Sequence, residues 1–312
     1  MILVTGGTGF IGQALIRHLV EAGHQVRTLI RPSRKSPRLP RGVSVEVAVA
    51  GLRDERSLRA AMVGVDTIYH LAGVERSGAE ADLLDIDVRG TQTVLSAALD
   101  AGVDRFFYLS HLGADRASAY PIFKAKAIAE EHIRRSGIDY TIMRTAIVFG
   151  PNDGFTISLA QLLSSFPFVF FIPGDGDTVI QPLWVEDLVT CLAWALEEEN
   201  TRSQVYELGG PEYLSLREII ETMMNKIATK RTLVSMPPPY MRALTVFLEY
   251  VLPASPVSVY WIDYLATNRT CPLDTIPRVF NLMPSRFSHR LAYLEGQDWR
   301  LHLLRTVFRR RV

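Results

Sequence analysis

The hydrophobic positions at the start of the chain predict a strand, a helix and a second strand. Residues 2–4 form a short apolar run, which is typical of a strand buried on both faces of a sheet. From residue 10 to residue 19, apolar side chains recur every three or four positions, which predicts a helix with one buried face. Gly23 follows this helix, and residues 25–30 form a second apolar run. The opening of the chain therefore predicts a β-α-β unit.

The same pattern continues through the first half of the chain. We expect further strands at 43–49, 65–71, 105–110 and 140–144, and further helices at 55–62 and 87–101. Strands that alternate with helices build a parallel sheet. The predicted fold class is α/β, a Rossmann-type doubly wound parallel sheet with a smaller, mostly helical C-terminal substrate lobe. The expected Rossmann domain spans 1–150, with 177–210 returning to it, and the expected lobe spans 151–176 and 211–312.

Three evenly spaced glycines separate the first strand from the first helix. Gly6, Gly9 and Gly12 would allow a sharp turn, a close approach to a pyrophosphate and close packing of the helix on the strand. The start of the helix adds free N–H groups and a positive dipole end. Between a strand and a helix, this pattern predicts a dinucleotide site. The expected cofactor contacts here are Gly6, Thr8, Gly9, Phe10, Ile11 and Gly12, joined after the fourth strand by Leu71, Ala72 and Gly73.

The second strand ends at Arg31, and Arg34 and Lys35 follow closely. An acidic residue at this position would bind the ribose 2′-hydroxyl of NAD, whereas an arginine suits the 2′-phosphate of NADP. We therefore expect NADP(H) to be preferred, with NAD(H) as the alternative. A second interpretation of this basic loop is an ordinary solvated surface.

Composition and charge narrow the remaining classes. The net charge of +1 gives no overall positive field that would attract nucleic acid. The two cysteines, Cys191 and Cys271, lack the spacing of metal ligands. We expect no metal site and a cytoplasmic location, because the chain begins directly with a strand and has few cysteines. Two apolar stretches, 240–252 and 301–312, keep a peripheral contact with the inner face of a membrane open.

Several segments resemble a known family. TGGTGFIG, HLAG, YLSHLGA, SGIDYTIMR, VFGPNDG and QPLWVEDL occur in the order found in the extended and atypical short-chain dehydrogenase/reductases. The chain looks most like the NAD(P)-binding branch that includes NmrA-like proteins and the dehydrogenase-like accessory subunit of respiratory complex I. The resemblance runs from residue 1 to about residue 220. Many relatives have an Asp after the third strand, where this chain has Ala50-Gly51-Leu52, so we expect Leu52 and the backbone to contact the adenine.

The resemblance also implies a tyrosine and a lysine four residues apart, which pass a proton to the substrate as hydride moves. Tyr120 and Lys124 have this spacing, and Ser110 would then orient the substrate carbonyl. Pro121 favours an extended conformation for Tyr120, outside the helix. In a competing register, Lys126 is the family's lysine and Ile122 stands where the tyrosine belongs. One of the two lysines is expected to touch the nicotinamide ribose.

Two functions follow from these alternatives. The first is an NADP(H)-binding oxidoreductase or epimerase that acts on a small organic molecule, with an apolar substrate as one option. Its catalytic residues would be Tyr120, Lys124 and Ser110. The second is a non-catalytic NADP(H)-binding module, such as a redox sensor, an assembly factor or an accessory subunit of a membrane complex. The oligomeric state is left open.

Overall fold

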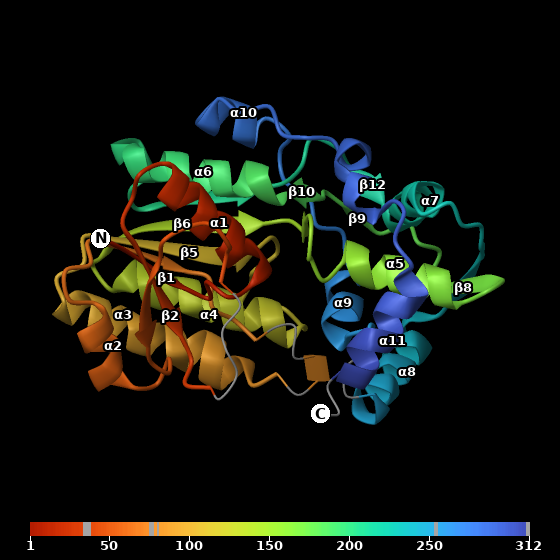
Figure 1. Ribbon diagram of the computed structural model, residues 1–312, viewed down its shortest axis with the longest axis horizontal. Helices are drawn as coiled ribbons and strands as arrows, with labels where there is room; N and C mark the ends of the chain where they lie inside the picture. Colours follow the sequence, from red (N-terminus) through yellow and green to blue (C-terminus); the bar gives the residue numbers. More distant parts are fainter. Residues whose placement is uncertain (34–38, 75–77, 80, 253–254, 310–312) are drawn as a thin grey trace.

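The computed structural model describes residues 1–33, 39–74, 78–79, 81–252 and 255–309 of the chain, with the side chains of 306–309 left out (Figure 1). Within this part, a seven-stranded parallel sheet lies at the centre, in the order β11-β6-β5-β4-β1-β2-β3. Its strands are β1 Ile2–Thr5, β2 Val26–Ile30, β3 Glu46–Val49, β4 Thr67–His70, β5 Arg105–His111, β6 Asp139–Thr145 and β11 Gln204–Leu208. The order reverses between β1 and β4, which creates the switch point where α/β sheets bind ligands. The predicted fold class is confirmed.

Helices cover both faces of this sheet (Figure 1). On one face lie α1 Phe10–Glu21 and α6 Val185–Glu197, and on the other lie α2 Glu55–Ala61, α3 Thr91–Asp100 and α4 Pro121–Arg135. Leu15 and Leu19 of α1 share a buried cluster with Leu188 and Leu192 of α6. The apolar face predicted for the first helix is therefore buried between the sheet and α6.

The helix predicted at 87–101 differs from the structure at its start. The chain forms a π-helix, η2 Leu84–Gly90, which continues directly into α3. A π-turn contains one more residue than an α-turn, and this shifts the side chains that follow it around the helix axis. Asp87, in the middle of η2, is buried. Apolar spacing alone does not distinguish the two kinds of turn.

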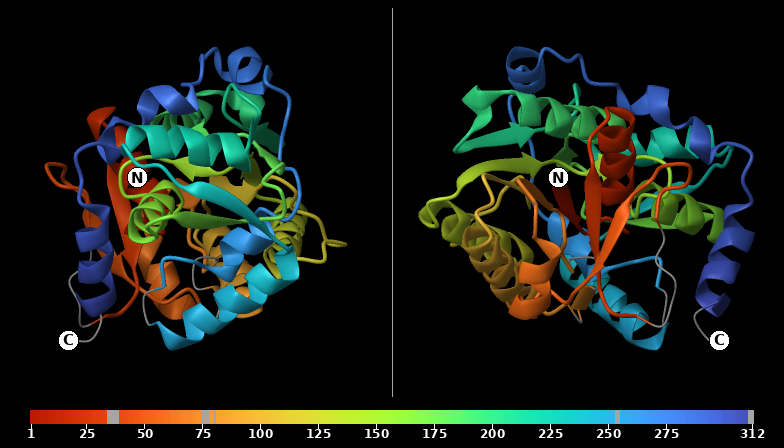
Figure 2. Two further views of the ribbon diagram at one scale, coloured as in Figure 1. Left: turned by 90° about the vertical axis from the view of Figure 1, so that its right-hand side faces the viewer. Right: turned by 60° about the vertical axis from the view of Figure 1, so that its left-hand side comes forward.

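The remaining elements form the smaller lobe and its connections (Figure 2). The lobe contains α5 Thr156–Ser165, α7 Leu216–Lys226, α8 Pro238–Val251, α9 Val259–Tyr264 and α11 Trp299–Arg309. Its strand pairs are β8 Val169–Pro173 with β13 Thr232–Met236, and β9 Val179–Ile180 with β12 Leu214–Ser215. Outside the lobe, β7 Val148–Phe149 pairs with β10 Leu183–Trp184, and α10 Thr275–Phe280 packs on α6 and β11. Short 3₁₀ turns in the described residues include η3 Glu199–Thr201, η4 Phe287–Arg290 and η5 Ala292–Leu294.

A buried arginine, Arg269, connects the lobe to the central domain. Arg269 donates from Nε to the carbonyl oxygen of Tyr264 at 3.0 Å and from Nη1 to that of Leu112 at 3.2 Å. Its guanidinium carbon lies 3.5 Å from the ring centre of Phe123 in α4. Arg269 therefore joins α9 to the loop after β5 and to α4. In the described residues, we find no helix that combines the length and the apolar character needed to cross a bilayer.

Candidate cofactor site

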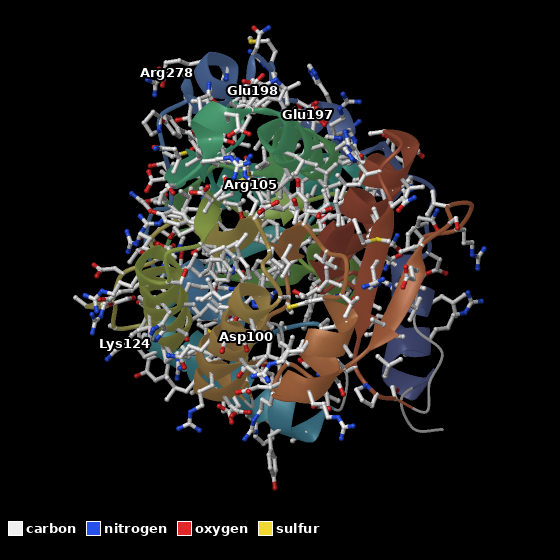
Figure 3. All side chains as sticks on the ribbon, turned by 90° about the vertical axis from the view of Figure 1, so that its left-hand side faces the viewer. Asp100, Arg105, Lys124, Glu197, Glu198 and Arg278 are labelled. Atoms are coloured by element: carbon white, nitrogen blue, oxygen red, sulfur yellow. The ribbon has the colours of Figure 1, made fainter. Side chains whose placement is uncertain are left out.

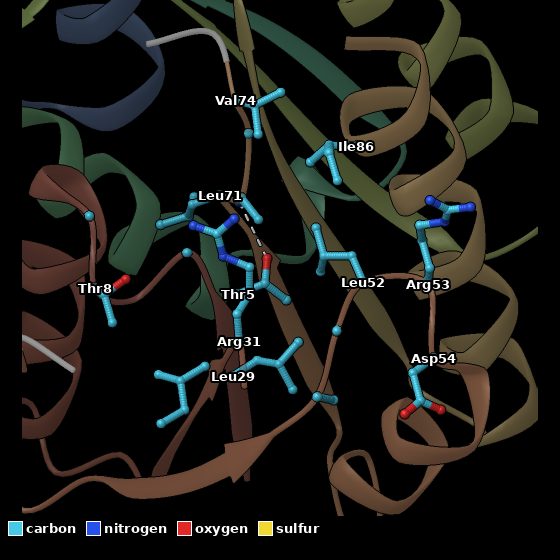
Figure 4. Close-up of a pocket in the computed structure, with 17 residues that line it drawn as sticks. Thr5, Thr8, Leu29, Arg31, Leu52, Arg53, Asp54, Leu71, Val74 and Ile86 are labelled. Carbon is cyan, nitrogen blue, oxygen red and sulfur yellow. Dashed lines mark hydrogen bonds between the residues drawn. The ribbon is translucent and has the colours of Figure 1, made fainter. Parts of the chain in front are cut away.

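A cavity of about 540 Å³ opens at the carboxyl ends of the first four strands (Figure 4). Because these strands are parallel, the loops that follow them meet at one edge of the sheet. The cavity is lined by Thr5, Gly6, Thr8 and Gly9 after β1, Leu29, Ile30 and Arg31 at the end of β2, Ala50, Gly51, Leu52, Arg53 and Asp54 after β3, Leu71, Ala72, Gly73 and Val74 after β4, and Ile86 from η2.

The glycine turn fits a phosphate-bearing cofactor. Gly6 has a φ of +73°, and a Cβ there would lie 2.8 Å from the backbone carbonyl of Leu71. A Cβ on Gly12 would meet the carbonyl oxygen of Gly6 and lie 2.7 Å from Cα of Gly7. Gly9 is the N-cap of α1 and has no side chain to occupy the free N–H groups of the first turn. Those groups and the helix dipole would hold a pyrophosphate.

Arg31 supplies positive charge at the end of β2, and Figure 4 shows its guanidinium group pointing into the pocket. The acidic residue of the cavity wall is Asp54, and its carboxylate is bound to Ser57. Asp54 caps α2 by accepting hydrogen bonds from the hydroxyl of Ser57 at 2.6 Å and from its N–H at 3.1 Å. These bonds, the hydroxyl bond first, lower the pKa of Asp54. Two other basic residues of the predicted loop, Arg34 and Lys35, lie outside the described residues.

Leu52 is buried beside the cavity, where an adenine is expected to bind. It packs against η2, since a Cβ on Gly90 would lie 3.3 Å from Cβ of Leu52. Ile86 and Val74 extend the same apolar wall (Figure 4). Neither was predicted, although the order of a parallel sheet places the segments after β4 and before α3 at this edge.

Some predicted contacts line the cavity and others lie beside it. Gly6, Thr8, Gly9, Arg31, Leu52, Leu71, Ala72 and Gly73 are in its wall. Phe10, Ile11 and Gly12 lie in α1 and are not among the lining residues. Phe10 and Ile11 pack against the cluster between the sheet and α6, and Gly12 supports the turn from behind. Lys126, also predicted as a contact, belongs to a separate buried cluster.

Lys126 is buried on the inner face of α4. Its ammonium nitrogen lies 3.1 Å from Oδ1 of Asp87 and 5.4 Å from the ring centre of Tyr108. The other carboxylate oxygen of Asp87 accepts a hydrogen bond from the N–H of Val74 at 3.2 Å. Lys126 is thus connected to the cavity wall through Asp87.

His70, at the end of β4, joins the same polar cluster. Its Nδ1 lies 2.7 Å from the hydroxyl of Thr5 and its Nε2 lies 3.0 Å from the hydroxyl of Thr91. Because Thr91 donates its own hydrogen to the carbonyl of Asp87, the imidazole donates from Nε2 and accepts at Nδ1. Burial, and then the charge of Lys126, lower the pKa of His70 to about 3. His70 is therefore a neutral structural residue.

The structure does not bring Tyr120, Lys124 and Ser110 together. Tyr120 is the extended N-cap of α4, because Pro121 occupies the first helical position. Lys124 is exposed on the outer side of α4 (Figure 3). The buried hydroxyl of Ser110 donates to Glu130 at 2.6 Å, and Glu130 also accepts a hydrogen bond from Arg144 at 2.7 Å.

The competing register places its lysine inside the protein. Ile122 stands four residues before Lys126, and both side chains are buried, as are Glu130 and Ile133 further along the same face of α4. Ile122 packs in the core of the lobe with Phe123 and Phe149. If this register applies, an apolar side chain stands at the position of the family's tyrosine.

Comparisons with known proteins agree with this geometry. Residues 6–158 match the NAD(P)H-binding family. Subunit 9 of the NADH dehydrogenase (ubiquinone) 1 alpha subcomplex from Arabidopsis thaliana mitochondria is 29% identical over 285 residues, which cover 89% of this chain and 67% of that protein. Sterol demethylase protein B from Methylococcus capsulatus is 29% identical over 271 residues, which cover 79% of this chain and 80% of that protein.

A solved structure also shares the fold. The NADPH-dependent quinone oxidoreductase QOR2 of Escherichia coli, in complex with NADPH, superposes with a TM-score of 0.75 at 21% identity, over 94% of this chain and 99% of that one. The glycine turn, the cavity and the sequence matches lead to one conclusion. Residues 6–158 form an NAD(P)H-binding domain, and the chain resembles the extended and atypical short-chain dehydrogenase/reductases.

Proposed function

We propose that this protein is an NADP(H)-binding module whose function depends on cofactor occupancy and not on hydride transfer through a tyrosine–lysine pair. Its role would be that of a redox sensor, an assembly factor or an accessory subunit. The observation that carries this proposal is the buried Ile122, four residues before the buried Lys126. An isoleucine side chain has no proton to give to a substrate oxygen.

The neighbouring polar groups support the same reading. Lys126 is paired with Asp87, so its charge is compensated within the protein. Ser110 uses its hydroxyl hydrogen on Glu130 and would have to break that bond to reach a substrate carbonyl. When bound, the nicotinamide cofactor supplies a hydride donor or acceptor, but Ile122, four residues before Lys126, gives it no proton donor at that position.

The preference for NADP(H) rests on Arg31. A guanidinium can form paired, charge-assisted hydrogen bonds with a phosphate, and Arg31 lines the cavity at the end of β2. Asp54 is held by Ser57 and would not compete for a ribose hydroxyl. NADP(H) would therefore bind more tightly than NAD(H).

A second candidate is a reductase or epimerase in which Tyr120 donates the proton. Two observations favour it: the similarity to sterol demethylase protein B covers most of both chains, and the side chain of Tyr120 is partly exposed. The ring of Tyr120 meets that of Phe123 edge-on at 6.4 Å, next to the core of the lobe. An apolar small molecule would be the expected substrate class.

Calorimetry and a turnover assay separate the two candidates. NADPH is titrated into the wild-type protein, and NADPH consumption is then followed with a panel of aldehydes, ketones and quinones. We expect binding without consumption above background, and the same result for Tyr120→Phe and Lys124→Met. Turnover in the wild type that Tyr120→Phe abolishes would establish the second candidate. If neither NADPH nor NADH bound, both candidates would fail.

A further inference from the structure

Helix α8 exposes an apolar stripe at the surface of the lobe. Tyr240, Leu244, Phe247 and Val251 recur every three or four residues, so they share one face of the helix. Tyr240 is 71% exposed, Phe247 60% and Val251 51%, and Tyr250, which flanks the stripe, is 86% exposed. The buried residue of α8 is Thr245. This helix therefore directs most of its large apolar side chains toward solvent.

The two charged residues of α8 bind to neighbouring segments, although the side chain of Arg242 is also 52% exposed. Arg242 donates to Asp263 of α9 at 2.9 Å. Glu249 accepts hydrogen bonds from the N–H groups of Val259 at 3.0 Å and Ala79 at 3.1 Å. Both charges bind α8 to its neighbours, and the exposed stripe consists of uncharged side chains, one of which is Tyr240, with Tyr250 beside it.

Helix α11 places basic and apolar side chains next to one another. Leu301 and Leu304 are exposed, and they lie between Arg300 and Arg305. From Trp299 to the end of the chain, the sequence has five arginines and no acidic residue, although the whole chain has a net charge of only +1. The last three residues, including two of these arginines, lie outside the described part of the chain.

Both helices reach the same edge of the molecule. In Figure 1, α8 and the C-terminal end of α11 lie at the lower edge, while α10 lies at the top. The two views of Figure 2 are turned about the vertical axis and keep this arrangement. A flat surface placed against the lower edge would meet the length of α8 and the end of α11.

We propose that this edge, defined by the exposed stripe of α8 and by Arg305 on α11, docks on a lipid surface that carries anionic headgroups. Uncharged apolar side chains would enter the boundary between headgroups and acyl chains, and tyrosines favour that depth. Arg305 would remain in the headgroup layer, where its charge contributes to attraction. The protein would bind at the membrane surface without crossing it.

The distribution of charge selects a lipid surface over a protein partner or a second copy of this chain. A second copy that met this edge would offer Arg305 no free acidic side chain on α8, because the acidic residue of that helix, Glu249, is bound to Val259 and Ala79. A protein groove would be expected to find free charges on α8, but Arg242 is bound to Asp263 and Glu249 to the backbone of Val259. An anionic bilayer matches both an uncharged stripe and a basic flank.

Vesicle flotation tests this proposal. The full chain is mixed with vesicles of phosphatidylcholine alone, or of phosphatidylcholine with phosphatidylglycerol, at low and at high salt. Phe247→Asp alters the stripe and Arg305→Gln alters the basic flank. Met283→Asp is the matched control, because Met283 is 81% exposed and follows α10 at the opposite edge. Tyr250→Asp provides a second substitution of a highly exposed residue beside the stripe.

We expect the wild type to float with the anionic vesicles and to lose binding as salt rises. Phe247→Asp and Tyr250→Asp should each weaken binding by at least about tenfold, Arg305→Gln by about fivefold, and Met283→Asp should have no effect. Absence of flotation, or flotation unchanged by Phe247→Asp, would overturn the proposal. So would a dimer in light scattering that Phe247→Asp abolishes, if the wild type did not float. Calorimetric titration of the same variants with NADPH measures whether they still bind the cofactor. Failure of the membrane proposal can thereby be distinguished from failure of the proposed function.

Discussion

Lys126 and Asp87 form an ion pair inside the protein, with 3.1 Å between the ammonium nitrogen and a carboxylate oxygen. Lys126 comes from α4 and Asp87 from the π-helix η2, so the pair joins these two helices below the carboxyl edge of the sheet. The second oxygen of Asp87 accepts a hydrogen bond from the backbone of Val74, in the wall of the cavity. The inner lysine of α4 therefore has a structural partner in this chain.

The first prediction concerns the stability of this pair. Lys126→Met should lower the free energy of unfolding by about 3–5 kcal/mol, because it leaves the buried carboxylate of Asp87 without its partner. Lys124→Met, on the exposed side of the same helix, should change it by less than about 0.5 kcal/mol. Urea denaturation measures both values. A double variant, Asp87→Leu with Lys126→Met, should recover part of the loss, and equal effects of the two single lysine changes would contradict the buried pair.

The second prediction concerns cofactor choice. Arg31→Ala should weaken NADPH binding by about tenfold to a hundredfold, because charge-assisted hydrogen bonds to the 2′-phosphate are lost. NADH binding should change little, since NADH lacks that phosphate. Arg41→Ala is the control, because Arg41 is exposed and is not among the residues that line the cavity. Isothermal titration calorimetry measures both affinities. Equal losses of affinity for NADPH and NADH would show that Arg31 does not bind the 2′-phosphate.

The third prediction concerns the glycine turn. Gly6→Ala would force a side chain into a left-handed conformation and into contact with the carbonyl of Leu71, so cofactor binding should be lost. Gly23→Ala also has a positive φ, but nothing lies within 4 Å of the added methyl group. It should cost about 1–2 kcal/mol of stability and leave the cofactor affinity unchanged. Titration with NADPH after a folding check by circular dichroism distinguishes the two variants.

The fourth prediction concerns acid stability. The pKa of His70 is about 3 in the folded protein and near 6.5 in the unfolded chain, so between these values the unfolded chain binds one more proton. The contribution of neutral His70 is fully present above pH 6.5 and is lost as the pH falls. Between pH 7 and pH 5 the loss should be about 2 kcal/mol, at about 1.4 kcal/mol per pH unit below the unfolded value.

A His70→Asn variant isolates this effect. Its free energy of unfolding should be lower at neutral pH, because the bridge between Thr5 and Thr91 is disturbed, and it should vary less with pH than that of the wild type. Urea titrations at pH 5 and pH 7 provide the comparison. Parallel pH profiles for the two proteins would show that His70 does not titrate in this way.

The sequence predicted the inner strands of the central sheet well because β1, β4 and β5 are almost wholly buried, and such strands appear as short apolar runs. It also placed the glycine turn and Arg31, whose positions follow directly from the first β-α-β unit. Contacts such as Ile86 and Val74 were missed because they come from segments with no phosphate-binding pattern of their own. Sheet order brings these segments to the site, and that order follows from the topology of the complete chain.

The register of α4 shows why spacing alone could not locate the site residues. Lys124 and Lys126 both fitted the family's spacing, and the structure exposes the first and buries the second. One signal was present in the sequence: Ile122, Lys126 and Glu130 are four residues apart and must share one helix face. That face also carries Ile133, which marks it as the inner one. The π-helix at Leu84–Gly90 could not be recognised in the sequence, because its extra residue per turn does not alter the amino-acid composition.

The contacts of Arg269 bear on whether the lobe can move when a cofactor binds. Moving the lobe away from the sheet would break the hydrogen bonds from Arg269 to Leu112 or to Tyr264 and remove the guanidinium from the ring of Phe123, at a cost of about 1–3 kcal/mol. This energy favours one fixed angle between the two parts. A movement of the lobe between the empty and the loaded protein would therefore require cofactor binding to supply this energy.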